Sequence, residues 1–165
     1  MEFFHYLEQT GFAAWIRESD SIWAYPTILF LHTIGLGIVV GINSAIDLRI
    51  LGLASRLPLE PLEGLFPLMW VGFWINAASG SLLLIADAST KLANPVFYIK
   101  MGFIALAVVD VFVIRKRVFR DPLIDKRPVT FNGKILAAVS LSLWLGAITA
   151  GRLMAYLGPV SGLQQ

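Results

Sequence analysis

The sequence predicts an all-α integral membrane four-helix bundle, preceded by a short N-terminal amphipathic helix that lies in the membrane interface. Two observations carry this prediction. Of the 165 residues, 57% are hydrophobic and only 15% are charged, whereas a soluble domain usually carries about a quarter charged residues. The apolar residues also fall into long runs, and about 20 residues span the hydrocarbon core as a helix. We expect residues 1–165 to form a single membrane domain.

Four apolar segments are the predicted spans, at about 23–46, 65–86, 96–114 and 135–155. The first three begin at or near Pro26, Pro67 and Pro95, where a missing N–H costs a helix least. Aromatic residues such as Trp23 and Tyr156 lie towards the span ends, as in the aromatic belts of membrane proteins.

Residues 1–20 are predicted to form the interfacial helix. Phe4, Leu7 and Trp15 recur at roughly helical spacing, with Glu8 and Arg17 elsewhere on the helix. A short segment with an apolar face and this many charges lies on a membrane and does not cross it.

The distribution of basic residues predicts the orientation. Most of the 13 lysines and arginines follow the first and third spans, on one side of the membrane: Arg49, Arg56, Arg115, Lys116, Arg117, Arg120, Lys126, Arg127 and Lys134. The other side receives Arg17, Lys91, Lys100 and Arg152. By the positive-inside rule the basic loops face the cytoplasm, and both termini face the periplasm if the cell is bacterial. We therefore expect a multi-pass protein of the bacterial inner membrane.

The sequence excludes several kinds of chemistry. It has no cysteine, and therefore no disulfide, thiolate metal site or thiol nucleophile. It shows no Gly-rich phosphate loop, serine triad, zinc-binding helix motif or basic nucleic-acid patch. We therefore predict no catalytic residue, no metal site and no nucleic-acid partner, and we favour a role that is not enzymatic.

His32, deep in the first span, is the first candidate binding residue, because ionisable side chains at such depth mark functional sites. Three interpretations stay open. The imidazole is neutral and hydrogen-bonded to Ser79, Ser81 or Thr149; it is an axial ligand of haem b; or it contacts a proton or a quinone.

Haem usually needs a second axial ligand. Met101, Met154 or the His32 of a second copy are candidates for that role. Together with His5, the same residues also suit a soft cation such as Cu(I), although their spacing follows no recognised metal pattern.

Arg152, at the edge of the last apolar run, is the second candidate binding residue. In one interpretation it forms a structural ion pair with Glu18 or Asp20. In the other it binds an anion, such as a haem propionate, a lipid phosphate or a carboxylate ligand.

Asp110 is the carboxylate placed deepest in a span, and burial there requires a partner or a proton. Asn43 and Ser140 are expected at the same depth. We expect Asp110 to link the first, third and fourth spans, with a proton relay as the alternative.

Gly37 and Gly41 are spaced for close approach of another helix. We expect them to pack against a neighbouring helix of the bundle, or against a second copy or another subunit of a larger membrane complex.

Short motifs that resemble those of a protein family occur along nearly the whole chain. They include Tyr25-Pro26, Leu31-His32-x-x-Gly35, Asp47-Leu48-Arg49-Ile50-Leu51-Gly52, Pro67-x-x-Trp70-x-Gly72-Phe73, Asn94-Pro95-x-Phe97-x-x-Lys100 and Gly151-Arg152-x-x-Ala155-Tyr156. Together they resemble a family of four-helix bacterial inner-membrane proteins known only as a domain of unknown function. The resemblance implies the four-span fold and no established activity. Some relatives place a second histidine near the inner end of the third span, where this chain has Ile114 and Arg115, and this departure weakens the case for a two-histidine cofactor site.

The first function hypothesis is a non-catalytic accessory or scaffold subunit that packs laterally through Gly37 and Gly41. The alternative is a haem b-binding electron-transfer protein that uses His32, with Arg152 as a second cofactor-binding residue. A small-molecule transporter is a further alternative, but the sequence has neither the inverted repeat nor the broken helix pair typical of that class.

Overall fold

The computed structural model describes residue 11 and residues 25–156. The four long helices are α3 (Tyr25–Leu51), α4 (Phe66–Ile85), α6 (Pro95–Ile114) and α7 (Phe131–Tyr156). Shorter elements connect them: the 3₁₀-helix η1 (Glu60–Leu65), α5 (Ala88–Ala93) and the π-helical turn η2 (Arg115–Phe119). The described residues contain no strand, and the predicted all-α fold is confirmed. The interfacial helix predicted for residues 1–20 lies outside the described part of the chain.

Four helical stretches are long and apolar enough to cross a membrane: Tyr25–Leu51, Glu60–Ile85, Pro95–Phe119 and Phe131–Met154. Large apolar side chains point away from the bundle, among them Trp74 at 67% exposure, Leu145 at 67% and Phe131 at 77%. So much exposed apolar surface suits lipid and not water. The chain is therefore a multi-pass membrane protein with the four predicted spans.

Helix α3 runs past the predicted end at residue 46 and stops at Leu51 for a local reason. Gly52 adopts a positive φ of 111°, which glycine tolerates without the penalty of a Cβ. Its N–H donates to the carbonyl of Arg49 at 3.1 Å, and the N–H of Leu53 donates to the carbonyl of Leu48 at 3.0 Å. This pair of bonds is the Schellman arrangement that ends many helices.

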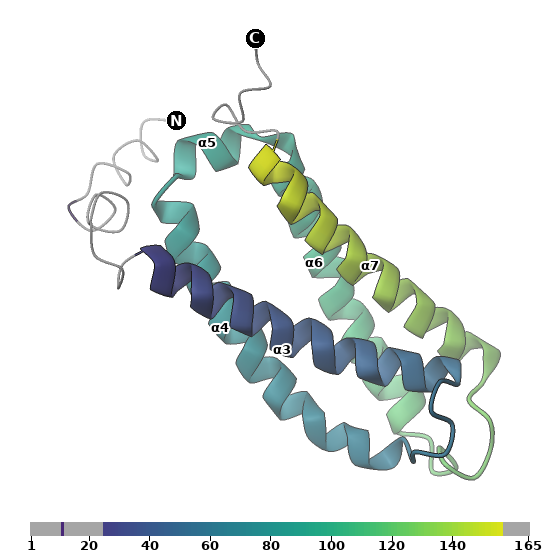
Figure 1. Ribbon diagram of the computed structural model, residues 1–165. Coiled ribbons are helices and arrows are strands. Elements are labelled where there is room, and N and C mark those ends of the chain that lie inside the picture. Colours follow the sequence, from purple (N-terminus) through teal and green to yellow (C-terminus); the bar gives the residue numbers. More distant parts are fainter. Residues whose placement is uncertain (1–10, 12–24, 157–165) are drawn as a thin grey trace.

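The bundle consists of two helix pairs. Helix α3 packs on α4, α6 packs on α7, and the contact of α3 with α7 joins the pairs. Figure 1 shows the connections at residues 52–59 and 120–130 close together at one end, here called the basic end, and α5 at the other, here called the α5 end.

Aromatic packing closes the basic end between α4 and α6. The rings of Phe66 and Phe119 meet edge to face with centroids 5.2 Å apart, and those of Trp70 and Phe112 lie 5.2 Å apart. Arg115 lies over the Phe66 ring at 5.5 Å. Most of the buried apolar core lies in this half of the molecule.

The closest approach of two backbones lies where α3 crosses α4. A Cβ added at Gly35 would lie 2.7 Å from the backbone nitrogen of Asn76 and 2.8 Å from the carbonyl oxygen of Gly72. A Cβ added at Gly72 would lie 2.6 Å from Ile38 Cγ2. Only glycine fits at these two positions, and the crossing depends on both.

The prediction that Gly37 and Gly41 pack against a neighbouring helix of the bundle is wrong. A Cβ added at either glycine would meet nothing within 4 Å, and both residues are exposed. The buried side of α3 carries Gly35, Val39 and Asn43. Residues two positions away point roughly opposite at 3.6 residues per turn, so these glycines face outwards.

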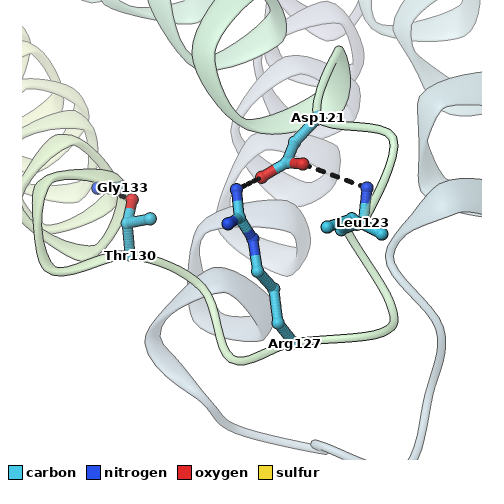
Figure 2. Close-up of polar contacts among 5 residues, drawn as sticks. All are labelled: Asp121, Leu123, Arg127, Thr130 and Gly133. Carbon is cyan, nitrogen blue, oxygen red and sulfur yellow. Dashed lines mark hydrogen bonds and ion pairs between the residues drawn. The ribbon is translucent and has the colours of Figure 1, made fainter.

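Aspartates organise the two loops at the basic end. Asp125 accepts hydrogen bonds from the backbone N–H groups of Leu59 at 2.7 Å and Glu60 at 2.9 Å, so one loop caps the start of η1 in the other. Figure 2 shows Asp121 bonded to the N–H of Leu123 and paired with Arg127. The loops therefore meet through specific polar contacts.

We predict that Gly72→Leu destabilises the bundle and that Gly41→Leu does not. A side chain at position 72 must displace Ile38 or part α3 from α4, and such overpacking costs about 1–3 kcal/mol. Thermal unfolding of the detergent-solubilised monomer measures the difference. Equal unfolding temperatures for the two variants would show that the crossing is not close.

We also predict that docking of the loops depends on pH through Asp125. The N–H groups of Leu59 and Glu60 hold the pKa of Asp125 below its usual range. The docking is therefore complete above the ordinary aspartate pKa of about 3.9 and is lost as the pH falls through the lower pKa of the folded state. At neutral pH, Asp125→Ala should raise the exchange of these two amides, measured by hydrogen–deuterium exchange.

The matched control is Asp121→Ala. That change should expose the amide of Leu123 and leave Leu59 and Glu60 protected. Unchanged exchange at Leu59 and Glu60 in Asp125→Ala would contradict the role of Asp125.

Candidate functional site

A pocket of about 380 Å³ lies among the four long helices in the half of the bundle nearer α5, and we call it the α5-end pocket. Its volume falls in the range of roughly 300–1,000 Å³ that is usual for ligand sites. Its walls are mainly apolar, and its lining residues are Leu29, His32, Thr33, Leu36, Val39, Phe73, Asn76, Lys100, Ile104, Trp144, Ala147, Ile148, Gly151 and Arg152.

A reciprocal pair of hydrogen bonds between α3 and α4 holds His32. Its Nδ1 lies 3.0 Å from the carbonyl oxygen of Asn76 and 3.2 Å from Oγ of Ser79. In return, Nδ2 of Asn76 donates to the carbonyl oxygen of His32 at 2.8 Å. Two bonds in opposite directions fix the register of the two helices at the pocket wall.

These contacts also assign the tautomer of the imidazole. The hydroxyl of Ser79 donates to the carbonyl of Ile75 at 2.6 Å, so both groups near Nδ1 of His32 act as acceptors. Nδ1 therefore carries the proton, and Nε2 has a free lone pair. A histidine whose Nδ1–H is bonded to a carbonyl is oriented as histidines are when they bind a metal through Nε2.

Gly80 makes room for the ring of His32. A Cβ added at Gly80 would lie 2.9 Å from Cε1 and 3.3 Å from Nδ1 of His32. The Nδ1–Cε1 edge of the imidazole thus lies close to the backbone of α4, and a larger residue at position 80 would push it out of place.

Two cations lie on the opposite wall, one from α6 and one from α7. Lys100 extends across Gly151, where an added Cβ would lie 3.6 Å from its Cε and 3.7 Å from its Nζ. The ammonium group of Lys100 therefore lies beside Gly151, the residue that precedes Arg152. The ion pairs among the described residues join Arg115 to Glu63 and Arg127 to Asp121, so neither pocket cation has an acidic partner there.

The pocket floor consists of core residues. Val39 at 3% exposure and Trp144 at 5% line the pocket and also belong to the buried core. Nε1 of Trp144 has no hydrogen-bond partner among the described residues. A buried donor without a partner is costly, and here it belongs to a side chain that lines a pocket.

The structure brings the two predicted cofactor-binding residues together, because His32 and Arg152 line one pocket. The predicted contact of His32 with Ser79 is present. Ser81 instead donates to the carbonyl of Ala77 in its own helix, and Thr149 is exposed. The predicted ion pair of Arg152 with Glu18 or Asp20 involves residues outside the described ranges.

The two methionines considered as second haem ligands do not line this pocket. Neither Met101 nor Met154 is among its lining residues, and Met101 is 46% exposed on α6. Among residues 25–156, no three His, Asp or Glu side chains come together as a metal site would require. The copper grouping also needs His5, which lies outside those residues.

Sequence reasoning missed Lys100 and Asn76. Lys100 was counted among the basic residues of the outer side and within a family motif, but not as a candidate binding residue, although a lysine inside a predicted span is itself a signal. Asn76 is an amide inside a predicted span and carries a similar, weaker signal. Neither residue's partner could be read from the sequence, because the partners lie on other helices.

A second polar cluster lies on the basic-end side of the pocket floor. Nδ2 of Asn43 donates to Oδ2 of Asp47 at 2.6 Å and to Oγ of Ser140 at 2.7 Å. Asp110 is also buried in this half. Asn43 and Ser140 thus join α3 to α7, and the carboxylate that they contact is Asp47 and not Asp110, which was expected to link the helices.

Comparisons with family models, curated proteins and solved structures find no match for this chain. The resemblance to a four-helix inner-membrane family therefore stays a prediction. Two features of the described residues bear on the function: the α5-end pocket and the polar cluster of Asn43, Asp47 and Ser140.

Proposed function

We propose that this chain is a non-catalytic membrane subunit that binds an amphiphilic anion in the α5-end pocket. One observation carries the proposal: Lys100 and Arg152, from different helices, share a mainly apolar pocket with His32. The apolar wall suits a hydrocarbon or ring system, and the two cations suit an acid group at its end.

The energetics favour an anion as the occupant. Cations at the edge of the membrane are costly unless they reach water, headgroups or an opposite charge. Hydrogen bonds between charged groups contribute about 1.5–3 kcal/mol each, and arginine can bind a carboxylate or phosphate with two parallel bonds. A fatty acid, a lipid headgroup and a haem propionate share this chemistry.

Haem b is the second candidate occupant, and the geometry of His32 favours it. The bond from Nδ1 to the carbonyl of Asn76 leaves Nε2 free as an axial ligand. Lys100 and Arg152 would hold the propionates. The lining offers one axial ligand from this chain, so a second ligand would have to come from a second copy or a partner subunit.

Transport is less well supported than binding. A transporter must expose its site to each side in turn. Here the basic end is closed between α4 and α6 by the paired rings of Phe66, Trp70, Phe112 and Phe119.

The lateral partner of the subunit would pack on α3. Gly37 and Gly41 are exposed and open, and small residues four apart let another helix approach closely. A second copy or another subunit of a membrane complex could pack on this side of α3, because no other described helix of the bundle contacts it at Gly37 or Gly41.

We further propose that the basic end faces the cytoplasm of a bacterium and that both termini face the periplasm, because the described loops at that end hold most of the basic residues. A phosphatase fused after Gln165 should be active, and one inserted at Asp125 should be inactive. The reverse pattern would overturn the orientation.

The binding proposal predicts that the pocket cations set the affinity for an amphiphilic acid. Equilibrium binding of radiolabelled palmitate to the purified protein is the measurement. Lys100→Gln and Arg152→Gln should each weaken binding about tenfold to a hundredfold, because each removes a charged hydrogen bond worth about 1.5–3 kcal/mol. Lys116→Gln, which removes an exposed charge at the basic end, is the matched control and should bind as wild type does.

The absorption spectrum of the same preparation identifies the occupant. A haem spectrum that His32→Ala abolishes and Lys116→Gln retains would assign the pocket to haem b. A colourless protein that binds palmitate through Lys100 and Arg152 would assign it to a lipid or fatty acid. Equal palmitate binding by all variants, with no haem spectrum, would overturn the proposal.

A further inference from the structure

Two carboxyl groups are buried between the pocket floor and the basic end. Asp47 on α3 has 0% exposure and Asp110 on α6 has 7%. Oδ1 of Asp47 and Oδ2 of Asp110 are both shielded from solvent and have no hydrogen-bond partner among the described residues. Both carboxyl groups are therefore more than nine-tenths buried, and each has one oxygen without a partner.

No positive charge in the described part of the chain faces these groups. Helix α4 has no titratable side chain. On α3, Arg49 donates to loop carbonyls of Ser55 and Leu57. After α6, Arg115 pairs with Glu63. The remaining basic residues of this end are exposed, on η2, the loops and the start of α7: Arg56, Lys116, Arg117, Arg120, Lys126, Arg127 and Lys134.

The other acidic residues at this end lie in the loops and on η1. Asp121 and Asp125 are bonded within the loops, and Glu60 and Glu63 lie on η1. Asp47 therefore faces the charge of Asp110 and the neutral groups of Asn43 and Ser140.

A carboxylate in such surroundings takes up a proton, because an isolated buried charge costs several kcal/mol. Two neighbouring carboxylates cannot both ionise cheaply. We propose that Asp47 and Asp110 form a proton-binding site inside the membrane, which holds at least one exchangeable proton at neutral pH.

The two residues differ in their hydrogen bonds. Oδ2 of Asp47 accepts from Nδ2 of Asn43 at 2.6 Å, and an N–H donor stabilises the ionised form of a carboxyl group. Asp110 has no such donor among the described residues. The bond from Asn43 favours the ionised form of Asp47, whereas its complete burial opposes that form, so the proton is shared between the two carboxyl groups.

Infrared spectroscopy of the full-length protein in lipid nanodiscs tests this site without assuming a ligand. At neutral pH the wild type should show the C=O stretching band of a protonated carboxylic acid in apolar surroundings. The band should shift to lower frequency in D₂O, because the proton exchanges, and should disappear reversibly at high pH. Asp110→Asn should change the frequency or amplitude of the band, and the double variant Asp47→Asn with Asp110→Asn should lose the band, while both variants retain cooperative thermal unfolding.

Asp121→Asn is the matched control. Asp121 is a loop carboxylate paired with Arg127, and its replacement should leave the band at full amplitude. Three results would each overturn the proposal: no acid band in the wild type, a band unchanged in Asp110→Asn, or a band that does not shift in D₂O. A missing band together with a rise in thermal stability on addition of Na⁺ would assign the site to a metal cation instead.

Discussion

The close crossing of α3 and α4 at Gly35 and Gly72 is the constraint on which the α5-end pocket depends. With backbone atoms this close, the register of α4 against α3 cannot slip without a clash. His32 lies one turn before Gly35, and Asn76 lies one turn after Gly72. The reciprocal hydrogen bonds between His32 and Asn76 hold the two helices in this register. The crossing thus places the imidazole against α4 and leaves Nε2 free at the pocket wall.

The two ends of the bundle differ in what lies between the helix pairs. Towards the basic end, rings on α4 and α6 meet and fill the space between the two helix pairs. Towards α5, the space between the pairs is the α5-end pocket, whose lining comes from all four long helices. The candidate site is therefore the space that remains between the helix pairs towards α5.

The sequence predicts the spans well because hydropathy and length are local properties. It predicts a similar depth for Asn43 and Ser140 for the same reason, since depth follows from position along a span. The choice among the glycines of α3 is not local. Gly35, Gly37 and Gly41 have similar surroundings in the sequence, and the rotation of α3 about its axis decides which of them meets α4.

The candidate site shows the same division. His32 and Arg152 could be picked out singly, as ionisable residues inside or at the edge of a span. That they share a pocket depends on the contact of α3 with α7, which pairs residues more than a hundred positions apart. Lys100 joins them because Gly151 leaves room for its side chain. The sequence of α6 does not predict this contact with α7.

The polar cluster of Asn43, Asp47 and Ser140 also stabilises the bundle, because it lies where the two helix pairs join. Apolar packing between helices gains little in lipid, whose chains are equally apolar, and an interhelical hydrogen bond contributes about 0.6–2 kcal/mol. The bond from Asn43 to Ser140 at 2.7 Å crosses the α3–α7 contact. Val39 and Trp144 lie one turn from these residues on the same two helices and form the pocket floor. A change in the charge of Asp47, which shares the Asn43 amide, therefore acts on the same helix contact that shapes the pocket.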